Sequence, residues 1–290
     1  MFNKKAILRG LLLLIIINIF PIVATADVGP KPSLEIVVKG MEDNNYWLDL
    51  LVTDKSEYSW LELSYGERER VKKLAEYVDE EGFHPALLVG TQVPLNGELR
   101  GVKNPDNTNS HKFSYMGTPE RFKIAILTED NTLIISDVIN RKNFNSIVEF
   151  DLRGEVLQGD IILSAGQAKE ISPILNMSIG FIFRLLLTLA IEIGIALLFG
   201  FTIKNSGKIL LKTNILTQVL LNIAILWMNL SYGMLAALFI FVLMEILIII
   251  FETIIYAKYL TEKPKSRRIA YGVVANIVSL VVGFGINLVM

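Results

Sequence analysis

The chain has 290 residues, of which 52% are hydrophobic, and a formal net charge of −1. Its mean hydropathy of +0.48 is too high for an ordinary soluble domain and favours a membrane protein. The absence of cysteine excludes disulfides, thiolate metal sites and cysteine nucleophiles.

Charge divides the chain into two regions. Residues 27–170 carry 25 acidic and 16 basic side chains, whereas the remainder carries 4 acidic and 12 basic ones. An acidic region repels phosphates, so no nucleic-acid partner is expected. The predicted fold class is an α+β membrane protein, in which an extracellular β-sandwich-like domain with one inserted helix precedes a four-helix transmembrane bundle. The expected domains are a signal peptide over 1–26, the extracellular domain over 27–170 and the transmembrane domain over 171–290.

The first 26 residues have the pattern of an export signal. Lys4, Lys5 and Arg9 precede an apolar run over 11–20, and the sequence "ATA" at 24–26 is a small-residue cleavage pattern. An uncleaved anchor helix is the alternative, but an apolar run of about 10 residues is too short to span a membrane comfortably. Either interpretation places the chain outside the cytoplasm from residue 27 onward.

Segments of strand length follow, separated by turn residues. "SLEIVVKG", "YWLDLLVT" and "SIVEFDLRG" predict strands, and "RFKIAILTEDNTLIISDVI" predicts a hairpin that turns at 129–131. In "GERERVKKLAEYVDEEG", the spacing of Val71, Leu74, Ala75 and Val78 predicts one helix. These strands predict a small β-sandwich-like domain.

Two lone histidines in this region, His84 and His111, are expected at the surface. They lie 27 positions apart and have no companion cysteines, so no metal site and no cofactor are predicted.

The apolar half predicts four spans, near 174–201, 210–229, 234–258 and 269–290, each close to the length of about 20 residues that crosses a bilayer. Lysine and arginine gather in the loops near 202–209 and 259–268, so the positive-inside rule places both loops in the cytoplasm. The C-terminus is then extracellular, and the predicted location is the bacterial cell membrane.

Polar residues recur at helical spacing within all four spans and predict an intramembrane polar cluster. We expect Glu252 to meet Glu192, Gln218 and Asn276 in the cytoplasmic half of the bilayer. Arg184 in the first span is the only cation deep enough to pair with Glu245 in the third span. We expect these two side chains to form an ion pair. The predicted cluster consists of Arg184, Glu192, Gln218, Asn222, Glu245, Glu252 and Asn276.

Three functions are compatible with such a cluster. Interhelical hydrogen bonds could assemble the bundle, or the carboxylates and carboxamides could line a path for protons, cations or a small solute. An intramembrane enzyme is the weakest of the three, because residues 174–290 contain no His, Asp or Cys. The leading hypothesis is a non-enzymatic envelope sensor, anchor or accessory subunit. The alternative is a small proton, cation or solute transporter. Expected partners are the lipid bilayer and a membrane protein or a second copy of the chain.

Several short motifs give the chain a resemblance. The stretch "ADVGPKPSLEIVVKG", with "YWLDLLV" and "TPERFKIAIL", resembles the exported part of a group of polytopic membrane proteins from clostridial-type Gram-positive bacteria, whose mature N-terminus has an "AD-x-GPKPS" pattern. "TLAIEIGIALLFG", "EILIIIFETIIY" and "YGVVANIVS" resemble the membrane half of that group. The resemblance implies an architecture and a bacterial membrane location, and it supplies no activity.

Overall fold

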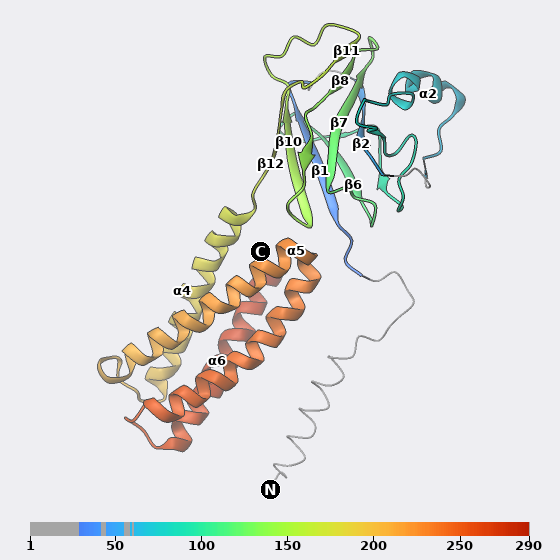
Figure 1. The fold of residues 1–290 in the computed structure, drawn as a ribbon. Helices are drawn as coiled ribbons and strands as arrows, with labels where there is room; N and C mark the ends of the chain where they lie inside the picture. Colours follow the sequence, from blue (N-terminus) through green and yellow to red (C-terminus); the bar gives the residue numbers. More distant parts are fainter. Residues whose placement is uncertain (1–28, 42–44, 55–58, 60, 290) are drawn as a thin grey trace. The chain divides into compact units, whose positions relative to one another are not determined.

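The computed structural model describes residues 29–41, 45–54, 59 and 61–289 of the chain. The predicted signal peptide over 1–26 lies outside these residues. Within them, two β-sheets and two short helices precede three long helices (Figure 1).

The first sheet has the strand order β12-β10-β1-β6-β4, and β5 also pairs with β6. β1 is parallel to β10 and antiparallel to β6, so the sheet is mixed. Its strands are β1 (Ser33–Lys39), β4 (Asn96–Gly97), β5 (Val102–Lys103), β6 (Asn109–Ser114), β10 (Asn145–Asp151) and β12 (Gln167–Glu170).

The second sheet has the order β11-β8-β7-β2-β3, and β9 also pairs with β7. It is mixed as well, because β11 runs parallel to β8. Its strands are β2 (Tyr46–Val52), β3 (His84–Pro85), β7 (Arg121–Thr128), β8 (Leu133–Ile135), β9 (Ile139–Asn140) and β11 (Ile161–Ile162).

One hydrophobic core joins the two sheets. In β1 every second residue is buried, as the two-residue period of a strand requires. Ile36 and Phe113 of the first sheet belong to the same core cluster as Leu50 and Ile124 of the second. The arrangement is that of a β-sandwich, in line with the sequence-based expectation.

The predicted hairpin is confirmed: β7 and β8 pair antiparallel around a turn at 129–132, in which Asn131 has a φ of 66°. The inserted helix differs from the prediction, because two short helices, α2 (Tyr65–Arg70) and α3 (Lys72–Ala75), are broken at Val71. The apolar face at Val71 and Leu74 is only one turn long, so the helix ends where it leaves the core. Val78 is 62% exposed.

The expectation of a surface position is wrong for His111, which is only 1% exposed. His111 lies on the inward face of β6, and its ring centroid is 5.4 Å from that of Tyr46 in β2. The alternation of β6 buries this position together with Phe113 two residues later. His84 is half-buried in β3, with Nε2 2.8 Å from the backbone oxygen of Asp54.

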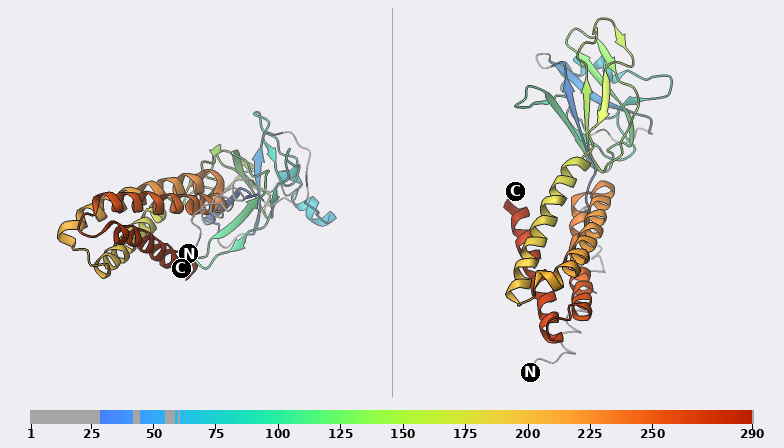
Figure 2. Two further views of the ribbon diagram at one scale, coloured as in Figure 1. Left: turned by 90° about the horizontal axis from the view of Figure 1, so that it is seen from below. Right: turned by 90° about the vertical axis from the view of Figure 1, so that its left-hand side faces the viewer.

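Three long helices follow: α4 (Ile174–Leu198), α5 (Ile203–Tyr259) and α6 (Lys265–Val289). α5 is interrupted at Gly233, whose φ of 83° and ψ of 178° are not helical. Its two halves fold back on each other, because Asn214 bonds to Tyr256 while Thr217, further along, bonds to Glu252. Figures 1 and 2 show the halves running side by side with α4 and α6.

Two of these helices, Ile174–Leu198 and Ile203–Tyr259, are long and apolar enough to cross a membrane. The spans expected near 210–229 and 234–258 fall in the two halves of α5. The span expected near 174–201 corresponds to α4, and the one near 269–290 falls largely in α6.

The connection between α5 and α6 caps the start of α5. The carboxylate of Glu262 accepts hydrogen bonds from the backbone N–H of Thr202 at 3.0 Å and from the hydroxyl of Ser206 at 2.9 Å. These donors lower the pKa of Glu262 below its ordinary value. The contact brings together the two basic segments that the sequence analysis expects on one side of a membrane.

Candidate functional site

Polar side chains inside the helical region form two groups. The first, called the closed network below, consists of Glu192, Asn214, Thr217, Glu252, Tyr256 and Asn276. The second lines a cavity of about 270 Å³, called the open cavity, whose polar residues are Arg184, Thr188, Gln218, Asn222, Glu245 and Ser279.

Glu252 is the centre of the closed network and has no exposed surface. One carboxylate oxygen, Oε2, accepts from the Asn276 amide at 3.0 Å and from the Tyr256 hydroxyl at 3.1 Å. The other, Oε1, lies 2.5 Å from the Thr217 hydroxyl. Together with Glu192 from α4, these side chains come from four helical segments, namely α4, the two halves of α5, and α6. Gly272 makes the approach of α6 possible, since a Cβ at that position would lie 2.9 Å from Cα of Thr253.

Glu192 joins the network from α4 and is 1% exposed. Its Oε2 accepts from the Asn214 amide at 2.7 Å and lies 3.4 Å from the Tyr256 hydroxyl. The Tyr271 hydroxyl donates to its backbone oxygen at 3.3 Å. Tyr256 thus stands between the two carboxyl groups with a single proton to donate.

Counting protons limits the hydrogen bonds that the Thr217 hydroxyl can make in this network. Besides Glu252, the Thr217 hydroxyl has the backbone oxygens of Thr213 and Asn214 within 3.0 and 3.1 Å. A hydroxyl has only one proton to donate, and a carbonyl oxygen can only accept. The geometry therefore accommodates a carboxylic acid at Glu252 that donates to Thr217, which donates onward to a carbonyl. Among the described residues no Lys or Arg forms an ion pair with either carboxyl group.

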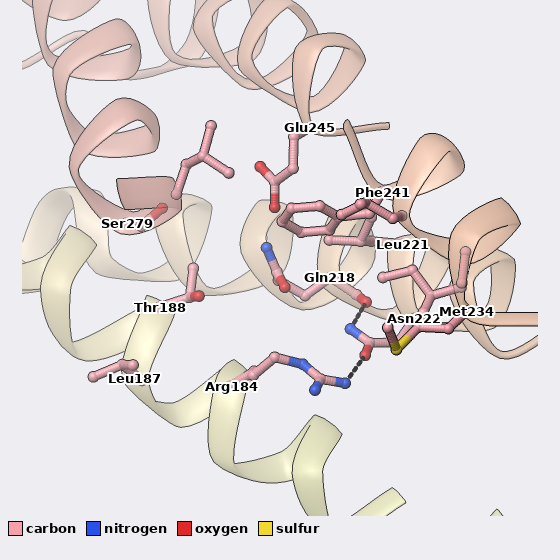
Figure 3. A pocket seen from close by; sticks show the side chains of 14 residues that line it. Arg184, Leu187, Thr188, Gln218, Leu221, Asn222, Met234, Phe241, Glu245 and Ser279 are labelled. Carbon is pink, nitrogen blue, oxygen red and sulfur yellow. Dashed lines mark hydrogen bonds between the residues drawn. The ribbon is translucent and has the colours of Figure 1, made fainter. Parts of the chain in front are cut away.

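Arg184 enters the open cavity from α4 (Figure 3). Its Nη2 donates to Oδ1 of Asn222 at 2.9 Å, and the Asn222 amide donates to the backbone oxygen of Gln218 at 2.8 Å. The second bond fixes the orientation of the Asn222 amide, so that its oxygen faces the guanidinium.

Glu245 enters the same cavity from the second half of α5 (Figure 3). It is only 8% exposed. No hydrogen bond or ion pair to its carboxylate is present within the part of the chain that the structure describes. An enclosed carboxylate without a partner is costly, which distinguishes Glu245 from the two carboxyl groups of the closed network.

The structure divides the predicted cluster between the two groups. Glu192, Glu252 and Asn276 belong to the closed network, whereas the other four predicted residues line the open cavity. Gln218 does not bond to Glu252 as expected, and Thr217 does so instead. Successive helical residues differ by about 100°, so only one of these two neighbours can face Glu252.

The expected ion pair between Arg184 and Glu245 is also not formed. The two residues line one cavity, but the guanidinium bonds to Asn222. The predicted cluster did not include Asn214, Thr217, Tyr256 or Tyr271. A usable signal existed for Thr217, because it follows Asn214 by three residues and so shares its helical face.

In the sandwich, the most unusual buried group is Asp49 of β2, which has no exposed surface. Its carboxylate accepts from the backbone N–H groups of Leu50, Leu87 and Leu88 at 2.8, 3.0 and 3.0 Å. Burial raises the pKa of Asp49 to about 7, although these N–H donors act to lower it. Asp49 thereby fastens the segment after β3 onto β2, which is a structural role.

Among the described residues no group of three or more His, Cys, Asp or Glu side chains could hold a metal ion. Comparison with protein families, curated proteins and solved structures finds no match for this chain.

Proposed function

We propose that this chain is a multi-pass bacterial cell-membrane protein that acts as a non-enzymatic envelope sensor, anchor or accessory subunit. One observation carries the proposal: the helical region has its polar side chains inside and its large apolar side chains outside. Glu252 is fully buried, while Leu198, Phe239 and Leu186 are 82, 65 and 61% exposed. Such an apolar surface is suited to lipid, and polar groups within a bilayer turn toward one another.

In this proposal four helical segments cross the bilayer, namely α4, the two halves of α5, and α6. The basic segments near 202–209 and 259–268 face the cytoplasm, and the sandwich and the C-terminus face outward. The charge asymmetry and the export-signal pattern support the same orientation independently. The resemblance of the chain to exported membrane proteins of Gram-positive bacteria agrees with this location.

The closed network supports a role in assembly for its two carboxyl groups. Glu192 and Glu252 have almost no exposed surface, and both accept hydrogen bonds from other helical segments. Interhelical hydrogen bonds of this kind contribute about 1 kcal/mol each in membranes. The network therefore acts as a fastener of the bundle, which holds the sandwich at the membrane.

Glu252→Gln tests this role, because glutamine has the shape of a protonated glutamate. Its amide can donate to Thr217 while its oxygen accepts from Asn276 and Tyr256. We expect Glu252→Gln to unfold within a few degrees of the parent protein. Glu252→Leu removes the acceptor that Thr217, Tyr256 and Asn276 share and should lower the midpoint of thermal unfolding clearly. Purified protein in detergent micelles is measured by differential scanning fluorimetry. Equal losses in both variants would contradict the fastening role.

Co-purification tests the accessory-subunit function itself. The tagged chain is extracted from its native membrane in mild detergent, and stoichiometric companions are identified by mass spectrometry. We expect a membrane-protein partner that is retained by Glu252→Gln. Recovery of the chain without any stoichiometric companion would oppose an accessory subunit.

The open cavity favours a second candidate, a small proton, cation or solute transporter. The observation is Glu245, whose carboxylate faces the cavity and has no partner among the described residues. Reconstituted liposomes that show no flux of protons, cations or amino acids under imposed gradients would exclude this function.

A further inference from the structure

We propose that the open cavity binds a small zwitterionic ligand, whose anionic group contacts Arg184 and whose ammonium group contacts Glu245. This inference concerns binding alone, so it holds whether the chain senses the ligand or moves it. Figure 3 shows the two charged side chains reaching into the cavity from different helices, with Gln218 between them in this view.

The guanidinium of Arg184 is oriented to bind an anionic group. A guanidinium has five N–H donors, and within the described residues the structure records one hydrogen bond from Arg184, to Asn222. Because the Asn222 amide is itself held by Gln218, the guanidinium is positioned before a ligand arrives. Its remaining donors suit a carboxylate or a phosphate, which accept paired hydrogen bonds from arginine.

Glu245 requires a cationic group. It is more than nine-tenths buried, its carboxylate faces the cavity, and it has no partner among the described residues. Arg184 does not satisfy it, because no ion pair between the two side chains is present among the described residues. An ammonium group, with three donors and a positive charge, would satisfy this carboxylate.

The other residues that line the cavity restrict the size and the polarity of the ligand. Leu187, Leu221, Leu238 and Phe241 give the cavity mainly apolar sides. Its volume of about 270 Å³ lies just below the range of about 300–1,000 Å³ for drug-sized pockets. The site therefore fits a molecule of amino-acid size with two opposite charges and an apolar part. A free amino acid and the aminoethyl-phosphate headgroup of a lipid share this chemistry.

The experiment uses the full chain in detergent micelles and three matched probes. L-leucine carries both charges, 4-methylpentanoate lacks the ammonium group, and 3-methylbutylamine lacks the carboxylate. We expect L-leucine to bind about 10- to 100-fold more tightly than either single-charge probe, since a hydrogen bond to a charged group is worth about 1.5–3 kcal/mol. Phosphoethanolamine, and nanodiscs of phosphatidylethanolamine against phosphatidylglycerol, test the lipid source. If phosphoethanolamine and phosphatidylethanolamine stabilise the protein, whereas phosphatidylglycerol and leucine do not, the ligand of this site is a lipid headgroup.

The variant Glu245→Gln should reduce the affinity for L-leucine about 10- to 100-fold and bring it close to that for 4-methylpentanoate. Glu252→Gln is the matched control, because it removes a buried carboxyl group outside the cavity, and the preference for L-leucine should persist. A Glu245→Gln protein that keeps the full preference would overturn the proposal.

A second measurement covers the case in which Glu245→Gln does not fold. The unmodified protein is treated with a hydrophobic carbodiimide, and labelling of Glu245 is mapped by mass spectrometry. A bound zwitterion should protect Glu245, while the single-charge probes should protect it much less. Equal labelling with every probe, together with no stabilisation by any zwitterion, would overturn the proposal.

Discussion

At the scale of single residues, Asp49 shows how a buried carboxylate can be structural. Its two oxygens accept three backbone N–H groups that bind the segment after β3 to β2. Asp49→Asn points an amide donor at some of these N–H groups, so it should destabilise the sandwich by about 1–3 kcal/mol. Hydrogen-exchange mass spectrometry of peptides that carry β2 measures the loss.

The matched control for that substitution is Asp54→Asn. Among the described residues the side chain of Asp54 accepts one exposed hydrogen bond, from the backbone N–H of Gln92 at 2.8 Å. Its replacement should therefore cost much less than that of Asp49. Equal protection of β2 in the two variants would show that the buried carboxylate of Asp49 contributes no more to stability than the carboxylate of Asp54.

His111 should make the sandwich sensitive to acid. Burial lowers the pKa of His111 to about 4 from an ordinary value of 6.5. Between these values the unfolded chain binds the proton and the folded chain does not, so stability falls as the pH falls from 6.5 to 4. The full effect is about 3 kcal/mol at 1.36 kcal/mol per pKa unit. Asp49 acts in the opposite direction, because its raised pKa lets the folded chain bind a proton first, between its ordinary 3.8 and about 7.

The variant His111→Phe isolates the histidine contribution. Phenylalanine keeps the packing on Tyr46 and does not titrate, so acidification from pH 6.5 to 4 should destabilise the variant less than the parent. Pulse proteolysis of the full chain across this range measures the slopes. Parallel slopes for the two proteins would refute the assignment to His111.

At the scale of elements, the reversal of α5 depends on Gly233. Its φ of 83° with ψ of 178° is a conformation that residues with a Cβ rarely adopt. Gly233→Ala should therefore cost about 1–3 kcal/mol and weaken the contact of Thr217 with Glu252 across the turn. Gly194→Ala in α4 is the control, since its added Cβ meets no atom within 4 Å. The midpoint temperature of thermal unfolding in micelles should fall only for Gly233→Ala. An equal fall in both variants would contradict the role of Gly233 in the turn.

The elements differ in how far the sequence determines them. The β7–β8 hairpin was predictable because its turn is local, and α4 because a long apolar run marks it. The parallel pairing of β1 with β10 joins Ser33 to Asn145, and no local pattern encodes a contact over such a separation. The same limit applies to the polar interior. Helical spacing indicated which faces are polar, but the rotation of each helix decided that Thr217, and not Gln218, meets Glu252.

At the scale of the whole molecule, the proposed membrane topology depends on a contrast between the surfaces of the two halves. The sandwich buries apolar residues such as Ile36 and Leu50, as a domain in water does. The helical region buries Glu192 and Glu252 and exposes Leu198 and Phe239, which is the reverse. This contrast supports the proposal that the helices lie in a bilayer and that the sandwich lies outside it.

Cysteine accessibility in intact cells tests that placement most directly, because the chain contains no cysteine and each introduced thiol is unique. Three exposed positions serve: Glu155→Cys in the sandwich, Lys204→Cys at the start of α5 and Lys265→Cys at the start of α6. A membrane-impermeant maleimide should label Glu155→Cys in intact cells and the two lysine variants only after permeabilisation. Labelling of Lys204→Cys or Lys265→Cys in intact cells, or protection of Glu155→Cys, would contradict the proposed topology.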